Sequence, residues 1–385
     1  MTKNYELKTL GSVATYINGR VFKPSEWEST GLPIVRIQNL TDKNAKCHYS
    51  SAAYEEKYKI HNGDLLFAWS ASLGAHIWNQ NDAWLNQHIF KVIPNDNIDK
   101  LYLYYFLQKV IAELYLKTHG SGMVHITKGP FMNTPIPVPS YTEQSRIVAR
   151  IEELFSELDK AVDTLKTTKE QLAVYRQAVL VDAFRVATNS THLKIGCVCA
   201  KIVDCPHSTP KWEKSGKLCL RTTNFKRGYL DLQSPNYVSE ETFHDRNRRI
   251  IPQPGDVLYS REGSVLGIAC TIPSNVYPCL GQRMMLLRSG EKLNNRYLMH
   301  YLNSPMVTNH VIATKGGTGS PHINVGDIKE FQIPIPSLEE QSNIVRQIEE
   351  QLSSCDNVEK TVDAILTQAD AMRQSILKQA FERKI

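Results

Sequence analysis

The sequence predicts an α+β protein in which two mixed α/β globular domains are joined by two long helices. Three observations lead to this prediction. The chain of 385 residues is too long for one ordinary core. A segment of 49 residues occurs twice, and each copy lacks proline and glycine beyond its first few residues while carrying a heptad pattern. We expect globular domains over 1–140 and 191–336, a central helix over 141–190 and a C-terminal helix over 337–385.

The internal repeat aligns Ile136–Phe184 with Ile333–Phe381 without a gap, and 21 of the 49 positions are identical. The two copies are 197 residues apart, a period far longer than that of a solenoid repeat. The repeating unit is therefore a whole domain followed by a helical arm.

Both arms carry the pattern of a helix start followed by a coiled coil. Ser140 with Glu143, and Ser337 with Glu340, fit a capping box after a proline-containing segment. Mostly apolar residues then recur in alternating steps of four and three from Ile147 to Val179 and from Ile344 to Ile376. This spacing predicts a coiled-coil seam. The two seams either bury each other or join a bundle with helices of another subunit.

The two globular domains share short matched segments in the same order, although they diverge elsewhere. The matches pair 36–40 with 221–225, 63–67 with 255–259, 86–87 with 281–282, and 122–126 with 319–323. We infer that one scaffold presents two different surfaces.

Positive charge is concentrated on the globular domains. Lysine and arginine outnumber the acids by 14 to 11 in residues 1–140 and by 18 to 11 in 191–336, whereas acids are in excess in both arms. A basic surface attracts phosphate backbones, so the domains are expected to bind nucleic acid and the arms to contact protein.

Several classes of protein and site are disfavoured. There is no apolar run long enough for a membrane span, and the N-terminal residues lack the apolar stretch of a signal peptide. The eight scattered cysteines suggest reduced thiols in the cytoplasm. Cys197, Cys199, Cys205 and His207 lack the spacing of a zinc site. There is no phosphate-binding loop, no glycine-rich methyl-donor turn and no Asn/Asp-Pro-Pro-aromatic segment, so we expect no catalytic residue, no metal and no cofactor on this chain.

Two divergent basic domains, each followed by a near-duplicate helix that opens with Ile-Pro-x-Pro-Ser and Glu-Gln, resemble the specificity (S) subunit of type I restriction–modification systems. The resemblance implies that the domains are target recognition domains, each recognising half of a bipartite, asymmetric site in double-stranded DNA. It also implies that the helices form an antiparallel coiled coil and dock two modification (M) subunits, which bind S-adenosylmethionine and methylate adenine. A restriction (R) subunit, where present, would use ATP and Mg²⁺. No membrane partner is expected. The rival hypothesis is a non-catalytic assembly scaffold whose domains bind other proteins, with little dependence on salt.

Candidate DNA-contacting residues are those whose side chains pair with base edges or phosphates and that lie in or near the matched segments and basic runs. In the first domain they are Arg36, Gln38, Asn39, Trp69, Ser70, Gln87, His88 and Ser121. In the second they are Arg221, Asn224, Arg246, Arg248, Arg249, Ser260, Arg261, Gln282, Arg283, Lys315, Thr318 and Ser320. The alternative is structural: matched Gly, Asp and Asn residues form turns, the two glutamines end strands, and the arginine run 246–249 is a solvated face.

Overall fold

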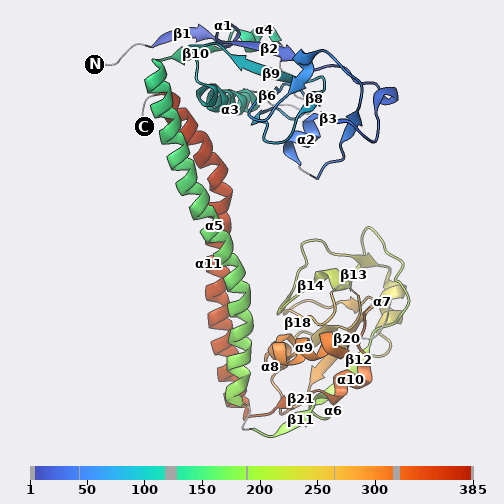
Figure 1. The fold of residues 1–385 in the computed structure, drawn as a ribbon. Helices are drawn as coiled ribbons and strands as arrows, with labels where there is room; N and C mark the ends of the chain where they lie inside the picture. The colour runs from blue at the N-terminus through green and yellow to red at the C-terminus, as the bar shows by residue number, and fades with distance from the viewer. Residues whose placement is uncertain are drawn as a thin grey trace. The chain divides into compact units, whose positions relative to one another are not determined.

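A computed structural model describes residues 5–42, 44–117, 128–187, 190–263, 265–314 and 321–382 (Figure 1). Four predicted DNA-contacting residues, Ser121, Lys315, Thr318 and Ser320, lie outside these ranges. The chain forms two compact units, Met1–Leu165 with Ala364–Ile385, and Lys166–Asp363. Each unit therefore contains one globular lobe and part of both arms.

The lobe of the first unit is built on two four-stranded sheets. One is antiparallel throughout and has the order β2 (Ala14–Asn18), β9 (Ile89–Pro94), β6 (Leu65–Ala68), β7 (Gly74–Ile77). The other has the order β4 (His48–Ser50), β3 (Leu32–Val35), β8 (Ala83–Leu85), β5 (Lys59–Ile60), and its central strands β3 and β8 are parallel. Strand β1 (Glu6–Thr9) pairs with β10 (Pro135–Val138), immediately before the arm. The helical elements are α1 (Leu10–Val13), η1 (Pro24–Glu26), α2 (Ile37–Thr41), η2 (Glu56–Tyr58), α3 (Lys100–Lys117) and α4 (Lys128–Met132).

The lobe of the second unit repeats the antiparallel sheet of the first, but its second sheet has three strands instead of four. Its antiparallel sheet has the order β12 (Cys199–Asp204), β20 (Met284–Ser289), β17 (Val257–Ser260), β18 (Ala269–Thr271). Its second sheet has the order β16 (Tyr237–Val238), β13 (Lys217–Leu220), β19 (Cys279–Leu280), and β13 and β19 are again parallel. Strand β11 (His192–Lys194) pairs with β21 (Gln332–Pro334) before the second arm, and β14 (Phe225–Lys226) forms a hairpin with β15 (Tyr229–Leu230). The helical elements are α6 (Ile195–Val198), η4 (Thr222–Asn224), α7 (Glu240–Arg246), α8 (Asn295–Asn303), α9 (Pro305–Thr314) and α10 (Val325–Glu330).

The two lobes therefore share one fold, although only short segments of their sequences match. Apolar side chains of α3 pack on the antiparallel sheet of the first lobe, and those of α8 pack on the equivalent sheet of the second. Tyr102 on α3 and Tyr297 on α8 are both fully buried, and each donates to a carbonyl of the strand before its arm, Pro137 at 2.8 Å and Pro334 at 3.0 Å.

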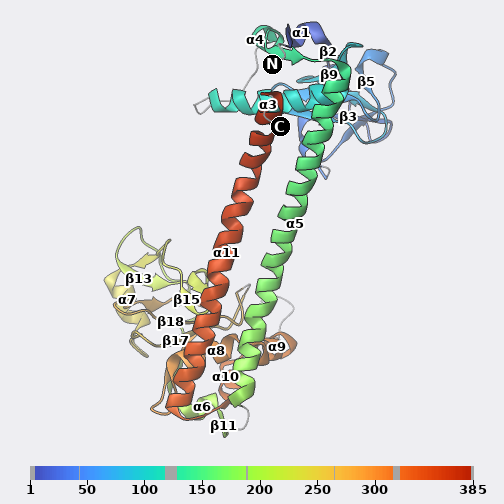
Figure 2. The same ribbon diagram turned by 90° about the vertical axis from the view of Figure 1, so that its left-hand side faces the viewer.

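The two arms are single helices, α5 (Tyr141–Val186) and α11 (Leu338–Phe381), as the heptads predict (Figure 2). In the second unit Lys169 pairs with Asp363 at 2.8 Å, and Arg176 pairs with Asp356 at 2.5 Å. Residue numbers rise on one helix as they fall on the other, so the two segments are antiparallel. The predicted antiparallel pairing of the two arms is confirmed in this unit.

Burial along the seam is narrower than the heptads suggest. On α11, Cys355 and Val362 are buried, whereas Val358 between them is 45% exposed. On α5, Tyr175 is 50% exposed although it occupies a predicted seam position. A pair of helices covers one stripe of each partner, so alternate apolar positions stay in contact with water.

A glutamine at the start of each arm joins it to its lobe. Gln144 accepts from the amide of Asp99 at 2.8 Å and donates to the carbonyls of Asn97 and Pro139, both at 2.9 Å. Gln341 makes the same three bonds, accepting from Asn294 at 2.8 Å and donating to Lys292 and Pro336 at 2.9 Å. Both glutamines are completely buried. The repeated glutamine thus fixes the point at which each helix leaves its lobe.

The capping box forms fully at only one arm. Ser337 and Glu340 exchange backbone-to-side-chain bonds of 2.9 and 3.2 Å. At the other arm the Glu143 amide donates to Ser140 at 3.4 Å, but the Glu143 carboxylate pairs with Arg146 instead of the Ser140 amide. A competing cation one turn away explains the difference.

Candidate nucleic-acid interface

The matched segments after β3 and β13 form the same turn, held by a buried asparagine. Asn39 accepts from the amide of Arg36 at 3.0 Å and donates to the carbonyl of Ala45 at 3.2 Å. Asn224 accepts from the amide of Arg221 at 2.8 Å and donates to the carbonyl of Asp231 at 3.0 Å. Both asparagines are more than 90% buried. Their side chains hold the turn together, which favours the structural alternative over base contact.

The matched Gly-Asp pairs also form a turn. Gly63 has φ of +89° and Gly255 has φ of +87°, a region that favours glycine. The following aspartate accepts from a backbone amide three residues earlier, His61 to Asp64 and Gln253 to Asp256, both at 2.8 Å. These residues shape the scaffold.

Arg36 and Arg221 present their guanidinium groups differently from most arginines of the two lobes. Each stands over a tryptophan ring, Arg36 over Trp27 at 5.7 Å and Arg221 over Trp212 at 5.2 Å from the ring centroid. Within the described residues neither guanidinium makes a hydrogen bond or an ion pair. Their donors are available to a ligand.

Arg246, which we predicted as a phosphate contact, points into the protein. Its side chain is 6% exposed and donates to the carbonyls of Leu280 at 2.6 Å and Gly281 at 2.7 Å, with longer bonds to Pro206 and Ser208. A guanidinium with its donors committed to backbone carbonyls has none left for phosphate. We therefore leave Arg246 out of the candidate surface.

Ser260 and Arg261 are likewise occupied inside the second lobe. Ser260 is fully buried, and its hydroxyl accepts from the amide of Ile268 at 2.9 Å. Arg261 is 7% exposed and forms a bidentate pair with Asp204 at 2.8 and 3.0 Å. Neither side chain is presented to a base, and both are left out of the surface.

Replacing Arg261 with alanine is expected to lower stability and leave DNA selectivity unchanged. The substitution removes the bidentate partner of the mostly buried Asp204 carboxylate and leaves it only His207, at 3.1 Å, which costs up to about 3 kcal/mol. Chemical denaturation measures the loss, and sequencing of methylated DNA measures selectivity. Normal stability together with a relaxed preference at one base pair would instead assign Arg261 to the DNA.

Exposed candidates remain at the surface of the second lobe. Arg248 and Arg249 are exposed next to the buried Arg246, and Arg248 pairs with Asp245 at 2.5 Å. Arg283 is exposed and lies 3.6 Å from Glu262, while Gln282 accepts from the hydroxyl of Thr209 at 3.1 Å. Surface pairs of this kind exchange readily for a ligand anion.

In the first lobe the candidates lie where β6 ends and β9 begins, and in the α2 turn. The Trp69 indole donates to Asn18 at 3.1 Å and contacts the ring of His88, with centroids 4.8 Å apart. Ser70 is buried, and Gln38 is exposed with its amide 3.2 Å from the carbonyl of Lys46. For Gln87, the backbone amide bonds to the Arg20 carbonyl at 2.9 Å, which supports its interpretation as a strand-end residue.

Sequence reasoning missed Trp27 and Trp212. Each precedes its arginine by nine residues, so both tryptophan–arginine pairs have the same offset of 185 residues as the matched turns. Extending the comparison of the matched segments toward the N-terminus would have found them.

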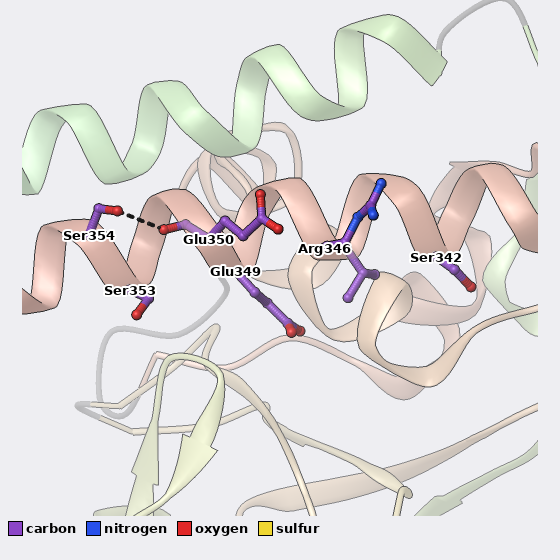
Figure 3. A pocket seen from close by; sticks show the side chains of 7 residues that line it. Ser342, Arg346, Glu349, Glu350, Ser353 and Ser354 are labelled. Atoms are coloured by element: carbon purple, nitrogen blue, oxygen red, sulfur yellow. Dashed lines mark hydrogen bonds between the residues drawn. The ribbon is translucent and has the colours of Figure 1, made fainter.

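No group of three or more His, Cys, Asp or Glu side chains in the described part of the chain is arranged to hold a metal ion. None of the described helices combines the length and the apolar character needed to cross a membrane. A hollow of about 570 Å³ on α11 is lined from Ser342 to Ser354 by one face of a single helix (Figure 3). Its Glu349 already pairs with Arg296 at 2.6 Å, and Ser354 donates to its own helix.

A family model described as "Type I restriction modification DNA specificity domain" matches residues 2–172 and 206–368. The chain belongs to this family. It is 24% identical to the Type I restriction enzyme EcoBI specificity subunit of Escherichia coli, over 98% of this chain and 85% of the relative. It is 22% identical to the MjaVIII specificity subunit of Methanocaldococcus jannaschii, over 92% of this chain and 87% of the relative. The prediction that it belongs with specificity subunits, not with the catalytic subunits, is confirmed.

Two solved structures have the same fold. One, from a study titled "Structural basis underlying complex assembly and conformational transition of the type I R-M system", has a TM-score of 0.68 at 21% identity and covers 100% of this chain and 99% of its own. The HsdS subunit of Thermoanaerobacter tengcongensis has a TM-score of 0.61 at 20% identity, covering 100% and 98%. The predicted fold class, two mixed domains joined by long helices, is confirmed.

Proposed function

We propose that this specificity subunit recognises a bipartite, asymmetric site in double-stranded DNA, with one lobe for each half-site and no catalysis of its own. The observation that carries the proposal is the duplicated lobe: the same strand order and the same buried turn asparagine recur, while the exposed side chains around them differ. A common scaffold with two different surfaces suits two different half-sites.

The charge of the lobes supports DNA as the ligand. Both lobes carry a basic excess, and each presents at least one exposed or half-exposed arginine with uncommitted donors, Arg36 in the first and Arg221 in the second. The remaining proposed contacts are Gln38, Trp69, Gln87 and His88 in the first lobe, and Arg248, Arg249, Gln282 and Arg283 in the second.

The arms are proposed to dock two M subunits. In the second unit Val174, Tyr175 and Val358 stay exposed along the paired helices, at 71%, 50% and 45%. Apolar residues left in water on a coiled coil suit a further helix packing beside it. The arms themselves are duplicated, which fits two copies of one partner. S-adenosylmethionine would then be bound by the M subunits, and ATP with Mg²⁺ by an R subunit, in the cytoplasm where the DNA lies.

Exchange of one lobe is expected to change one half of the methylated site and leave the other half as it was. The variant replaces 191–336 with the second lobe of another family member and is co-expressed with the M subunit of this system. Sequencing of methylated adenines gives the site. A change in both halves would contradict the assignment of one lobe to each half-site.

The scaffold hypothesis makes a different prediction for the purified chain with its M subunits. Proteins that neutralise DNA phosphates bind with a steep dependence on salt concentration, because counterions are released. Binding of the lobes to a protein partner, with no salt-dependent affinity for DNA, would favour the scaffold.

A further inference from the structure

A tryptophan–arginine pair recurs at equivalent positions in both lobes, and in the first lobe Trp27 also stacks on His48, with ring centroids 3.9 Å apart. Trp27 precedes Arg36 by nine residues, and Trp212 precedes Arg221 by nine. Next to each tryptophan, a glutamate amide bonds to a neighbouring tyrosine carbonyl, Glu28 to Tyr49 and Glu213 to Tyr237, both at 2.9 Å.

Each tryptophan packs on the parallel strand pair of its lobe. Trp27 lies against the cluster of Ile34 and Trp84, which are register partners in β3 and β8. Trp212 lies against Cys219 and Cys279, the register partners in β13 and β19. The two indoles therefore occupy equivalent places on equivalent strands.

In each arginine the backbone amide is held by a hydrogen bond, whereas the guanidinium makes no hydrogen bond within the described residues. The buried Asn39 and Asn224 hold the backbone amides of Arg36 and Arg221, so the side chains leave the turn from equivalent points. The indole face attracts the guanidinium face, and this uses none of its five in-plane N–H donors. Other lobe arginines differ: Arg246, Arg261 and Arg288 are bound by carbonyls or carboxylates within the lobe.

We propose that Trp27–Arg36 and Trp212–Arg221 are matched phosphate clamps, one in each lobe, that set the position of each half-site without recognising its bases. The inference rests on the proposed function. Two lobes that recognise different sequences share only the sugar–phosphate backbone as a common ligand. A device kept in the same geometry in both lobes, while their other exposed side chains diverge, is suited to that common ligand. A planar guanidinium binds phosphate in a bidentate manner. The indole ring restricts the orientations of the unbound guanidinium, so less conformational entropy is lost when phosphate binds.

Loss of the arginines is expected to weaken binding equally on all sequences. Each phosphate contact contributes about 0.9 to the slope of log affinity against log salt. In the double variant Arg36→Ala, Arg221→Ala, assembled with its M subunits, the slope should fall by about 1.8. At moderate salt its affinity for DNA of any sequence should fall on the order of tenfold or more for each arginine removed. The methylated motif should stay the same. Arg185→Ala, on the exposed surface of α5, removes one positive charge, as each clamp substitution does, and should leave the slope unchanged.

The tryptophans are positioning residues, and a graded series tests that role. Trp27→Phe keeps an aromatic face and should bind nearly as the wild type does, whereas Trp27→Leu keeps an apolar side chain without that face and should weaken binding severalfold on all sequences. The unfolding midpoint of each variant separates this effect from loss of packing against Ile34, because only variants that unfold at the wild-type midpoint are compared.

The outcomes distinguish the clamp from its alternatives. Relaxed selectivity at one base pair after Arg36→Ala or Arg221→Ala would make that arginine a base contact and overturn the inference while leaving the proposed function intact. An unchanged salt slope in the double variant would show that the pairs do not touch DNA. If the wild-type complex bound DNA without salt dependence and methylated no defined motif, the proposed function itself would be contradicted.

Discussion

Gln341→Leu is expected to lower the free energy of unfolding by about 3–5 kcal/mol, because it removes three hydrogen bonds at once. The amide of Asn294 and the carbonyls of Lys292 and Pro336 lose their partner at a fully buried side chain. Each buried polar group left without a partner costs about 1–3 kcal/mol. Leucine has a similar volume, so the loss reports the polar contacts and not a cavity.

Chemical denaturation of the full chain measures this effect, and two further variants define it. Gln368→Leu changes an exposed glutamine on the same helix and should shift stability by no more than about 0.5 kcal/mol. Gln144→Leu should cost as much as Gln341→Leu, because it breaks the equivalent three bonds in the first unit. A loss below about 1 kcal/mol for Gln341→Leu would mean that the arm is held to its lobe by apolar packing alone.

Arg246→Ala is expected to destabilise the second lobe by about 3–5 kcal/mol, whereas Arg249→Ala should change stability by less than about 0.5 kcal/mol. Arg246 is 6% exposed and holds the carbonyls of Leu280 and Gly281 at the end of β19. Those carbonyls would be buried without a donor. Arg249, three residues later, is exposed and is not buried among backbone carbonyls as Arg246 is.

The pair also separates stability from DNA binding. Arg249→Ala should reduce affinity for all DNA sequences and flatten the salt dependence by about one phosphate contact. Arg246→Lys should not restore stability, because an ammonium lacks the planar fork that reaches several carbonyls at once. If Arg246→Ala folded as stably as the wild type and lost only DNA affinity, the original prediction of a phosphate contact would stand.

The arms show how much of this fold was predictable from local sequence. Capping residues, the absence of helix breakers and a heptad pattern act within a few residues of one another, so helix boundaries near Tyr141 and Leu338 followed directly. The extent to which the seam is buried could not be predicted from local sequence. Whether Val358 is covered depends on the partner helix, and two helices are too few to cover it.

The candidate site divides in the same way. The chain's repeat, its basic lobes and the matched turns could be identified from the residues alone, and so could the family. The roles of Asn39 and Asn224 were foreseen only as one of two alternatives, since an asparagine that holds a turn and one that contacts adenine have the same side chain.

What the sequence by itself determined is the duplicated architecture, because repeats, heptads and caps are relations between residues at known spacing. What only the tertiary structure decided is which polar side chains face inward. Arg246 and Arg249 stand three positions apart in one basic run, yet one is buried among carbonyls and the other is exposed. The carbonyls that bind Arg246 come from residues 206–208 and 280–281, far away in the chain. Burial of a charge depends on such distant partners, and only the folded lobe brings them together.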